Sequence, residues 1–150
     1  MLLSMILKNL ATLGFIGYLP FAPGTFGTIA AVIFFALLKP PFAVHFFLLI
    51  SIALFGAFAS HRTEKMLNEK DSSHIVIDEF AGYSLTILSF PFTLPYLISA
   101  FLLFRFFDIL KPPPIRWLEK VLPGGAGIMA DDLMAGIYAN ALIQLWKVLG

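Results

Sequence analysis

The charged residues of this chain are confined almost entirely to two short segments. The sequence has ten basic and nine acidic residues, and eight of these nineteen lie in residues 61–79 and eight in residues 105–132, including all nine acids. The apolar stretches beside these segments are residues 26–38, 42–60, 80–104 and 133–149. Because ionisable groups are costly inside a bilayer and collect in loops, this pattern is typical of a polytopic membrane protein.

The composition agrees with that interpretation. Hydrophobic residues make up 59% of the chain and charged residues only 13%, whereas a soluble domain carries about 25% charged residues. The 150 residues suffice for one domain, which we expect to cover residues 1–150. There is no cysteine, which excludes disulfides, thiolate metal sites and cysteine nucleophiles. A formal charge of +1 provides no broad basic face, so we expect no nucleic-acid partner.

The N-terminal segment "MLLSMILKNLATLGF", residues 1–15, contains one lysine and no small-x-small cleavage site followed by a polar region. A removable signal peptide would carry such a site. We therefore expect a retained hydrophobic or interfacial helix at the N-terminus.

The apolar stretches predict short membrane spans. A spanning helix needs about 20 residues to cross about 30 Å of hydrocarbon, and residues 42–60 come closest to that length. Residues 26–38 require part of the preceding loop and end at the "KPP" of residues 39–41, because proline cannot continue a helix. The expected fold is an all-α, polytopic membrane helical bundle.

Residues 80–104 allow two interpretations. They could form one long kinked span, or two helices joined by a turn at "FPFTLP", residues 90–95, where two prolines stand four residues apart. The hairpin puts both charged segments, with seven of the ten Lys and Arg residues, on one side of the bilayer, as the positive-inside rule favours. We therefore favour the hairpin, with helices that start near Ile75 and end near Lys111 and charged segments that face the cytoplasm.

Two pairs of adjacent carboxylates stand where apolar stretches begin. Asp78 and Glu79 precede one such stretch, and Asp131 and Asp132 follow a glycine-rich segment and precede another. One aspartate at a helix N-terminus can be explained as a favourable interaction with the helix dipole. Two pairs together with Asp108 on one membrane face are instead what a hard divalent cation such as Mg²⁺ requires, since it takes oxygen ligands and shares phosphate oxygens.

Basic residues accompany these acids in "FRFFDILKPPPIRW", residues 104–117. Arg105, Asp108 and Lys111 are three residues apart and so share one face of a helix, and three prolines separate Lys111 from Arg116. An ion pair within the helix is the simpler interpretation. An arginine and a lysine held in this way could also bind a phosphate, the arginine through its bidentate fork and the lysine as a point charge.

The remaining glycine-rich stretch is "GYLPFAPGTFGT", residues 17–28. It lacks the lysine of a P-loop, and the simpler interpretation is a turn in which Thr25 caps a helix that starts at Phe26. Because free N–H groups at a helix N-terminus also bind anions, the Thr25 loop is a second candidate contact for a phosphate.

These four motifs, "GYLPFAPGTFGT", "IVIDEFAGY", "FRFFDILKPPPIRW" and "GGAGIMADDLMAGIYAN", occur in this order, and together they resemble the phosphatidylglycerophosphatase A family. The resemblance extends from about Gly14 to Ala141. It implies a magnesium-dependent lipid phosphatase of the bacterial inner membrane that converts phosphatidylglycerophosphate to phosphatidylglycerol and phosphate. The phospholipid substrate is made on the cytoplasmic side, which is where we expect the active site.

The motifs and the resemblance together assign roles to individual residues. We expect most magnesium ligands to come from Asp78, Glu79, Asp131 and Asp132, the substrate phosphate to be bound by Thr25, Arg105, Lys111 and Arg116, and the catalytic carboxylates to be Glu79, Asp108 and Asp131. Asp108 is either a further metal ligand or the partner of Arg105, and the choice of general base among the carboxylates stays open.

Other phosphatase chemistries lack their motifs. There is no Asp-x-Asp-x-Thr nucleophile, and the Lys/Arg–His–His signature of type 2 phosphatidic acid phosphatases is absent. His45 sits in an apolar span and is interpreted as structural, and His61 and His74 as surface residues. What remains is water activated by a metal, with a carboxylate as possible base.

Two other functions are considered. A small non-catalytic transporter or assembly subunit would also use polar residues in the membrane, but a transporter would carry charges near the middle of its spans. A phosphatidyltransferase would show the run D-G-x-x-A-R, which this sequence lacks.

Overall fold

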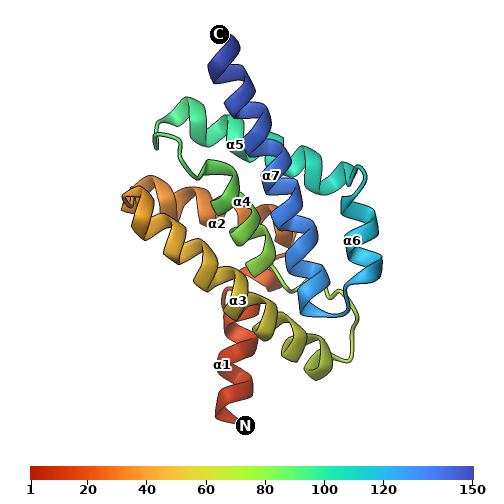
Figure 1. Ribbon diagram of the computed structural model, residues 1–150. Helices are drawn as coiled ribbons and strands as arrows, with labels where there is room; N and C mark the ends of the chain where they lie inside the picture. Colours follow the sequence, from red (N-terminus) through yellow and green to blue (C-terminus); the bar gives the residue numbers. More distant parts are fainter.

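The computed structural model describes residues 1–150 and contains helices but no strands (Figure 1). The elements are α1 (Leu2–Ala11), the 3₁₀ turn η1 (Ile16–Tyr18), α2 (Pro23–Leu38), α3 (Phe42–Leu67), α4 (Ile77–Ile87), α5 (Leu94–Leu110), α6 (Ile115–Val121) and α7 (Gly125–Leu149). The prediction of an all-α chain is therefore confirmed.

Prolines and left-handed residues set several helix ends. Helix α2 ends at Leu38 because Lys39 adopts a positive φ of 43° and prolines follow, as the sequence predicted. Helix α5 ends in the same way, with Lys111 at a φ of 45° before the run of three prolines.

Two predicted helix starts are wrong. Helix α2 begins at Pro23 with Ala22 as its N-cap and no side-chain cap, so Thr25 lies within the first turn instead of capping it. Proline fits the first turn of a helix because its missing N–H would have no partner there. Helix α7 begins at Gly125 rather than near Ile128, so the glycine-rich segment forms the first turn of the helix.

Residues 80–104 form two helices, as the hairpin interpretation predicted. Helix α4 ends at Ile87 and α5 starts at Leu94, and the proline-containing turn lies between them. The amide nitrogen of Asn140, on α7, lies 3.0–3.2 Å from three carbonyl oxygens at the end of α4. These contacts satisfy backbone acceptors that a helix end leaves without a partner.

Helix α4 lies at the centre of the molecule, where it contacts α2, α3, α5 and α7 (Figure 1). Its closest neighbour is α7, and a methyl group added at Gly136 would lie 2.5 Å from the carbonyl oxygen of Gly82. The backbones of the two helices therefore touch at these glycines. This close approach fixes the first turn of α4 relative to α7.

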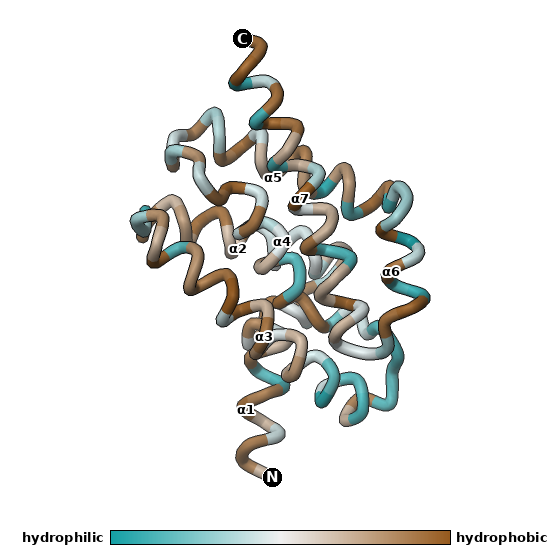
Figure 2. The backbone as a smooth tube through the Cα atoms, viewed as in Figure 1, coloured by the Kyte–Doolittle hydropathy of each residue, from teal (hydrophilic) through white to brown (hydrophobic).

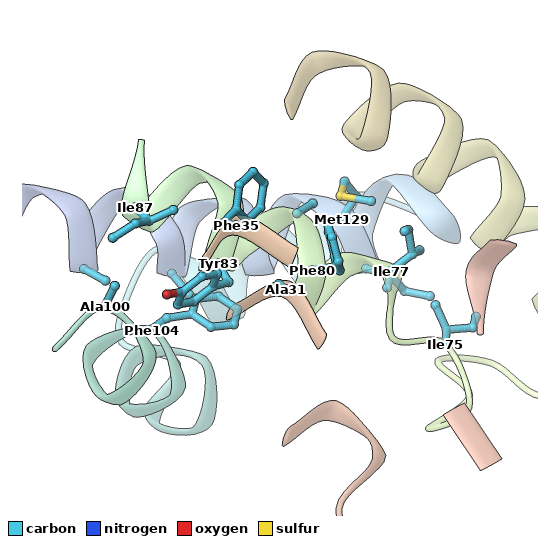
Figure 3. Packing of buried hydrophobic residues seen from close by; sticks show 14 of the residues in the cluster. Ala31, Phe35, Ile75, Ile77, Phe80, Tyr83, Ile87, Ala100, Phe104 and Met129 are labelled. Atoms are coloured by element: carbon cyan, nitrogen blue, oxygen red, sulfur yellow. The ribbon is translucent and has the colours of Figure 1, made fainter. Parts of the chain in front are cut away.

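Aromatic side chains fill the core around α4. Tyr83 and Phe104 lie side by side in Figure 3 and are fully buried, and the Tyr83 hydroxyl donates to the carbonyl oxygen of Leu97 at 3.1 Å. Phe35 and Phe80 pack with their ring centroids 5.9 Å apart. The central helix is therefore enclosed by protein on nearly all sides.

The outer surface is strongly apolar. Helix α3 is the one helix long and apolar enough to cross a membrane, and its 26 residues rise about 39 Å at 1.5 Å per residue. Phe47, Leu54 and Phe55 on α3 are each about 70% exposed. Figure 2 shows mostly hydrophobic residues along α3 and at the end of α7, hydrophilic residues at the α3–α4 connection, and a mixture of both along α6. These features are compatible with a helical membrane protein.

Candidate functional site

Three carboxylates from two helices converge near the centre of the molecule. Asp78 and Glu79 lie in the first turn of α4 and Asp132 near the start of α7, and one oxygen of each lies within 4.8 Å of the others. Asp78 and Asp132 are only 8% and 3% exposed. We call this group the carboxylate trio.

The trio has the donor set of a cation site. Asp78 Oδ1, Glu79 Oε2 and Asp132 Oδ2 are buried and have no hydrogen-bond partner within the protein. Buried polar atoms nearly always have a partner, and a hard divalent cation takes carboxylate oxygens as ligands. The three residues therefore fit Mg²⁺, with no nitrogen or sulfur ligand among them.

Burial and the proximity of like charges raise the pKa values of the three carboxyl groups in the trio. Burial, followed by the charge of Glu79, raises the pKa of Asp78 well above its usual range. Burial and the charge of Asp78 do the same to the pKa of Asp132, and burial raises the pKa of Glu79 to about 7. A cation among these groups would oppose each shift, because opposite charge favours the ionised carboxylate.

Arg105 and Asp108 form an ion pair beside the trio. The pair comes from the last turns of α5, and both side chains are largely buried, at 17% and 12% exposure. The Nε of Arg105 is buried without a partner, so its guanidinium has a donor to spare. This geometry supplies a fixed positive charge next to the carboxylates.

Gly24, in the first turn of α2, closes the site on another side. A methyl group added there would overlap Oε1 of Glu79 and lie 3.4 Å from Nη1 of Arg105. Only a residue without a side chain lets α2 approach this closely. Gly24 was not among the predicted site residues, whereas Thr25 beside it was, and Thr25 is half-buried in the same turn.

Asp131 is adjacent to the trio but is not one of its members. Its Oδ2 accepts from Lys111 Nζ at 2.8 Å and its Oδ1 accepts from the backbone N–H of Asp132 at 2.9 Å. Burial raises the pKa of Asp131 to about 6, although Lys111 acts in the opposite direction. Lys111 also donates to Glu119 at 3.2 Å, so it is held between two acids.

The remaining candidate cation, Arg116, lies away from the trio. It is exposed at the start of α6 and donates to the carbonyl oxygen of Leu110 at 3.3 Å. Arg116 and Lys111 line a cavity of about 500 Å³ on the outer side of the Lys111–Asp131 pair. The four predicted phosphate contacts therefore fall into two groups, with Arg105 and the Thr25 turn beside the trio and Lys111 and Arg116 at the cavity.

None of the histidines belongs to the trio. His45 is buried and lies 3.1 Å from the Ser84 hydroxyl, which agrees with its structural interpretation. His74 is half-buried, with Nδ1 at 2.8 Å from the carbonyl oxygen of Gly17 and its ring stacked on Tyr18. His74 thereby connects η1 to the segment that leads into α4.

Comparison with known proteins places this geometry in a family. The family model described as Phosphatidylglycerophosphatase A matches residues 9–147. The chain is 38% identical over 133 residues to a Phosphatidylglycerophosphatase A of Haemophilus influenzae, covering 85% of this chain and 82% of that protein. It is 33% identical over 129 residues to the Phosphatidylglycerophosphatase A of Escherichia coli, covering 85% of this chain and 75% of that protein.

A further relative carries another name. The chain is 40% identical over 138 residues to a Putative phosphatidylinositol-3-phosphatase of Bacteroides thetaiotaomicron, covering 86% of each chain. No solved structure matches. The family model spans nearly the whole sequence, including all four motifs and every residue of the trio, and the chain therefore belongs to the phosphatidylglycerophosphatase A family.

Proposed function

We propose that this protein is a magnesium-dependent lipid phosphatase that hydrolyses phosphatidylglycerophosphate to phosphatidylglycerol and inorganic phosphate. Family membership supports phosphatase activity. The observation that carries the metal dependence is the carboxylate trio, whose three buried oxygens have no partner in the protein.

Asp78, Glu79 and Asp132 are the residues proposed to hold the magnesium ion. When bound, the ion would neutralise charge on the phosphate and make a water molecule more acidic. Asp78 and Glu79 lie in the first turn of α4 and Asp132 lies on α7, and Gly82 and Gly136 bring these two helices into contact.

Arg105 is proposed to bind the scissile phosphate. Its partner Asp108 fixes the guanidinium beside Glu79, and Nε remains available as a donor. A preorganised donor of this kind stabilises charge that develops in the transition state. The N–H groups near Thr25, in the first turn of α2, are proposed to support the same phosphate.

The hydrolysis requires a proton acceptor among the carboxylates. The oxygen of water attacks phosphorus, the bond from phosphorus to the ester oxygen breaks, and the proton of the water passes through a carboxylate to the leaving alkoxide. Glu79, Asp108 and Asp131 are the proposed catalytic carboxylates. Asp108 and Asp131 are each held in position by a cation, Arg105 and Lys111 respectively.

The apolar surface supports a lipid substrate and a place in the membrane. A phosphate anchored by acyl chains lies at headgroup depth, and Asp78 and Glu79 of the trio lie in the first turn of α4. We propose a multi-pass protein of the bacterial inner membrane whose active site faces the cytoplasm. A transporter is less well supported, because the candidate span α3 carries no charge from Phe42 to His61.

A second candidate substrate is an inositol phospholipid that carries a phosphomonoester, because a relative at 40% identity is named for that activity. The trio and Arg105 would treat both phosphomonoesters alike. The distinction between them lies in the rest of the headgroup.

The proposal is tested with purified protein and vesicles that contain either phosphatidylglycerophosphate or phosphatidylinositol 3-phosphate. We expect phosphate release from the former, and loss of release when EDTA removes magnesium. Phosphate release from the inositol lipid alone would mean that the inositol phospholipid, and not phosphatidylglycerophosphate, is the substrate. Release that EDTA does not reduce would overturn the metal role, and no release from either lipid would overturn the function.

A further inference from the structure

A cavity with a charged lining lies beside the Lys111–Asp131 pair, and no residue of the trio lines it. The residues that line it come from the end of α3 and the following loop, the end of α5, α6 and the first turn of α7. Its volume of about 500 Å³ falls in the range of small-molecule sites. It is therefore a separate feature of the molecule, and its chemistry follows from the charges that line it.

Four basic side chains line this cavity, namely Lys70, Lys111, Arg116 and Lys120. Only Lys111 forms a salt bridge, since the ion pairs of the structure are Arg105–Asp108, Lys111–Glu119 and Lys111–Asp131. Three cations without a carboxylate partner thus face one cavity.

Three acids, Glu64, Asp71 and Glu119, also line the cavity, and two of them accept hydrogen bonds within the protein. Glu119 accepts from Lys111 at 3.2 Å, and Glu64 Oε1 accepts from the backbone N–H of Asp71 at 2.7 Å. The third acid, Asp71, forms no salt bridge. The four cations still outnumber the three acids of the lining, so the cavity carries an excess of positive charge. An anion fits this charge, and lysine and arginine are the usual contacts of a phosphate.

Lys111 connects the cavity to the trio. Its ammonium group lines the cavity and contacts Asp131, and Asp131 in turn accepts from the backbone N–H of Asp132. The cavity therefore lies one side-chain pair away from the proposed site of hydrolysis. Lys70, Asp71, Arg116 and Lys120 of its lining are exposed, and none of the exposed apolar residues of α3 lines it.

We propose that this cavity is a second phosphate-binding site, in which Lys70, Lys120 and Arg116 hold a phosphate group on the water side of the trio. The further statement that this phosphate comes from the substrate or the product of hydrolysis rests on the proposed function. The phosphate belongs either to inorganic phosphate leaving after hydrolysis or to the lipid headgroup. Both sources present the same anion to the same cations.

The test uses a Lys70→Ala/Lys120→Ala double variant of the full-length protein in detergent. Both lysines are exposed and neither belongs to the trio, so folding does not depend on them. Lys65→Ala is the matched control, because Lys65 is exposed on the last turn of α3 but does not line the cavity. Lys70→Arg/Lys120→Arg restores the charge.

The first measurement is calorimetric titration of inorganic phosphate without magnesium or lipid. We expect the double variant to bind phosphate about tenfold more weakly, as for the loss of two partly exposed charge contacts, with Lys65→Ala unchanged and the arginine variant restored. The difference should shrink at high salt. Because this measurement needs no turnover, it stands even if the proposed hydrolysis fails.

The second measurement separates the two sources, using vesicles that contain phosphatidylglycerophosphate. A higher inhibition constant for inorganic phosphate with an unchanged KM assigns the site to the released product. A higher KM with an unchanged inhibition constant and kcat assigns it to the headgroup. If the double variant matches the wild type in phosphate binding, inhibition and KM, the cavity is not a phosphate site and the proposal is overturned.

Discussion

At the scale of single residues, the site depends on which oxygen atoms have partners. Asp108 and Asp131 are each paired with a cation, while the trio retains three buried oxygens without one. A carboxylate already held by arginine or lysine is a poorer ligand for a second cation than one whose lone pairs are free. We therefore expect metal binding to depend more on the trio than on Asp108 and Asp131.

Glu79→Gln tests this distinction, because it keeps the size of the side chain and removes its charge. We expect phosphate release to fall on the order of a hundredfold, since the change removes a direct ligand and even indirect supports of metal sites cost 10–100-fold. Titration of the purified variant with Mg²⁺ should show weaker binding. Glu69→Gln is the control, because Glu69 lies in the same charged segment and only accepts from Ser72. An equal loss in both variants would mean that general loop charge, not the trio, supports activity.

Gly24→Ala should impair activity without destabilising the helix. Alanine is favoured over glycine in a helix by about 1 kcal/mol, but its methyl group would overlap Oε1 of Glu79. We expect phosphate release to fall on the order of tenfold, because small displacements of a catalytic group cost 10–100-fold, while the melting temperature stays level or rises. A Gly24→Ala/Glu79→Gln double variant should lose no more than Glu79→Gln alone. Additive losses would contradict the contact between the two residues.

Arg105 and Arg116 should respond differently to substitution. Loss of a preorganised donor costs about 3–4 kcal/mol, and we therefore expect Arg105→Ala to slow phosphate release about 100- to 1,000-fold. Arg105→Lys should be nearly as damaging, because a lysine cannot hold Asp108 and a phosphate through a planar fork. Arg116→Ala should change kcat less than about threefold, since Arg116 is exposed and lines a cavity to which no residue of the trio contributes. The reverse order in measured kcat would place the scissile phosphate at the cavity.

The motifs predicted the carboxylates but not their partners. Asp131 and Asp132 are adjacent in sequence, and on a helix neighbouring side chains point about 100° apart, so only the packing of α7 against α4 decides which one joins the trio. Lys111 binds Asp131 across twenty residues of intervening chain, a contact that no local spacing indicates. Gly24 was missed because its contribution is the absence of a side chain.

At the scale of helices, prolines made the order of elements predictable. The turn between α4 and α5 and the end of α2 lie where "FPFTLP" and "KPP" indicated. The position of α4 was not predictable, because its sequence does not say which neighbouring helices cover its apolar residues. What encloses α4 is its close contact with α7 through Gly82 and Gly136.

Gly136→Val tests this contact. A larger side chain at a tightly packed position costs about 1–3 kcal/mol, and here it would separate Asp132 from Asp78. We expect a lower melting temperature in detergent and reduced magnesium affinity. Ala141→Val is the control, because Ala141 is on the same helix but exposed. Equal destabilisation by both changes would show that α7 tolerates no added volume anywhere, and would remove the special role of Gly136.

At the scale of the whole molecule, charged residues of three helices meet beside the uncharged start of a fourth. The start of α4, the end of α5 and the start of α7 contribute the trio and the Arg105–Asp108 pair, and the start of α2 closes against them at Gly24. The turn between α2 and α3 lies at the other end of α3, whose 26 residues extend about 39 Å. A lipid headgroup and the metal would thus meet on one face, and the two ends of α3 should lie on opposite sides of the bilayer.

Cysteine labelling in intact cells tests this orientation, and the chain offers a clean background because it contains no cysteine. Ser73→Cys and Pro123→Cys place exposed thiols beside the charged segments, and Lys39→Cys places one at the α2–α3 turn. Positive residues favour the cytoplasmic side, and seven of the ten Lys and Arg residues lie in those segments. We therefore expect an impermeant reagent added outside to label only the variant at residue 39, and to label the other two only after the cells are opened. External labelling at residue 73 or residue 123, in variants that still release phosphate, would place the trio outside and contradict a cytoplasmic active site.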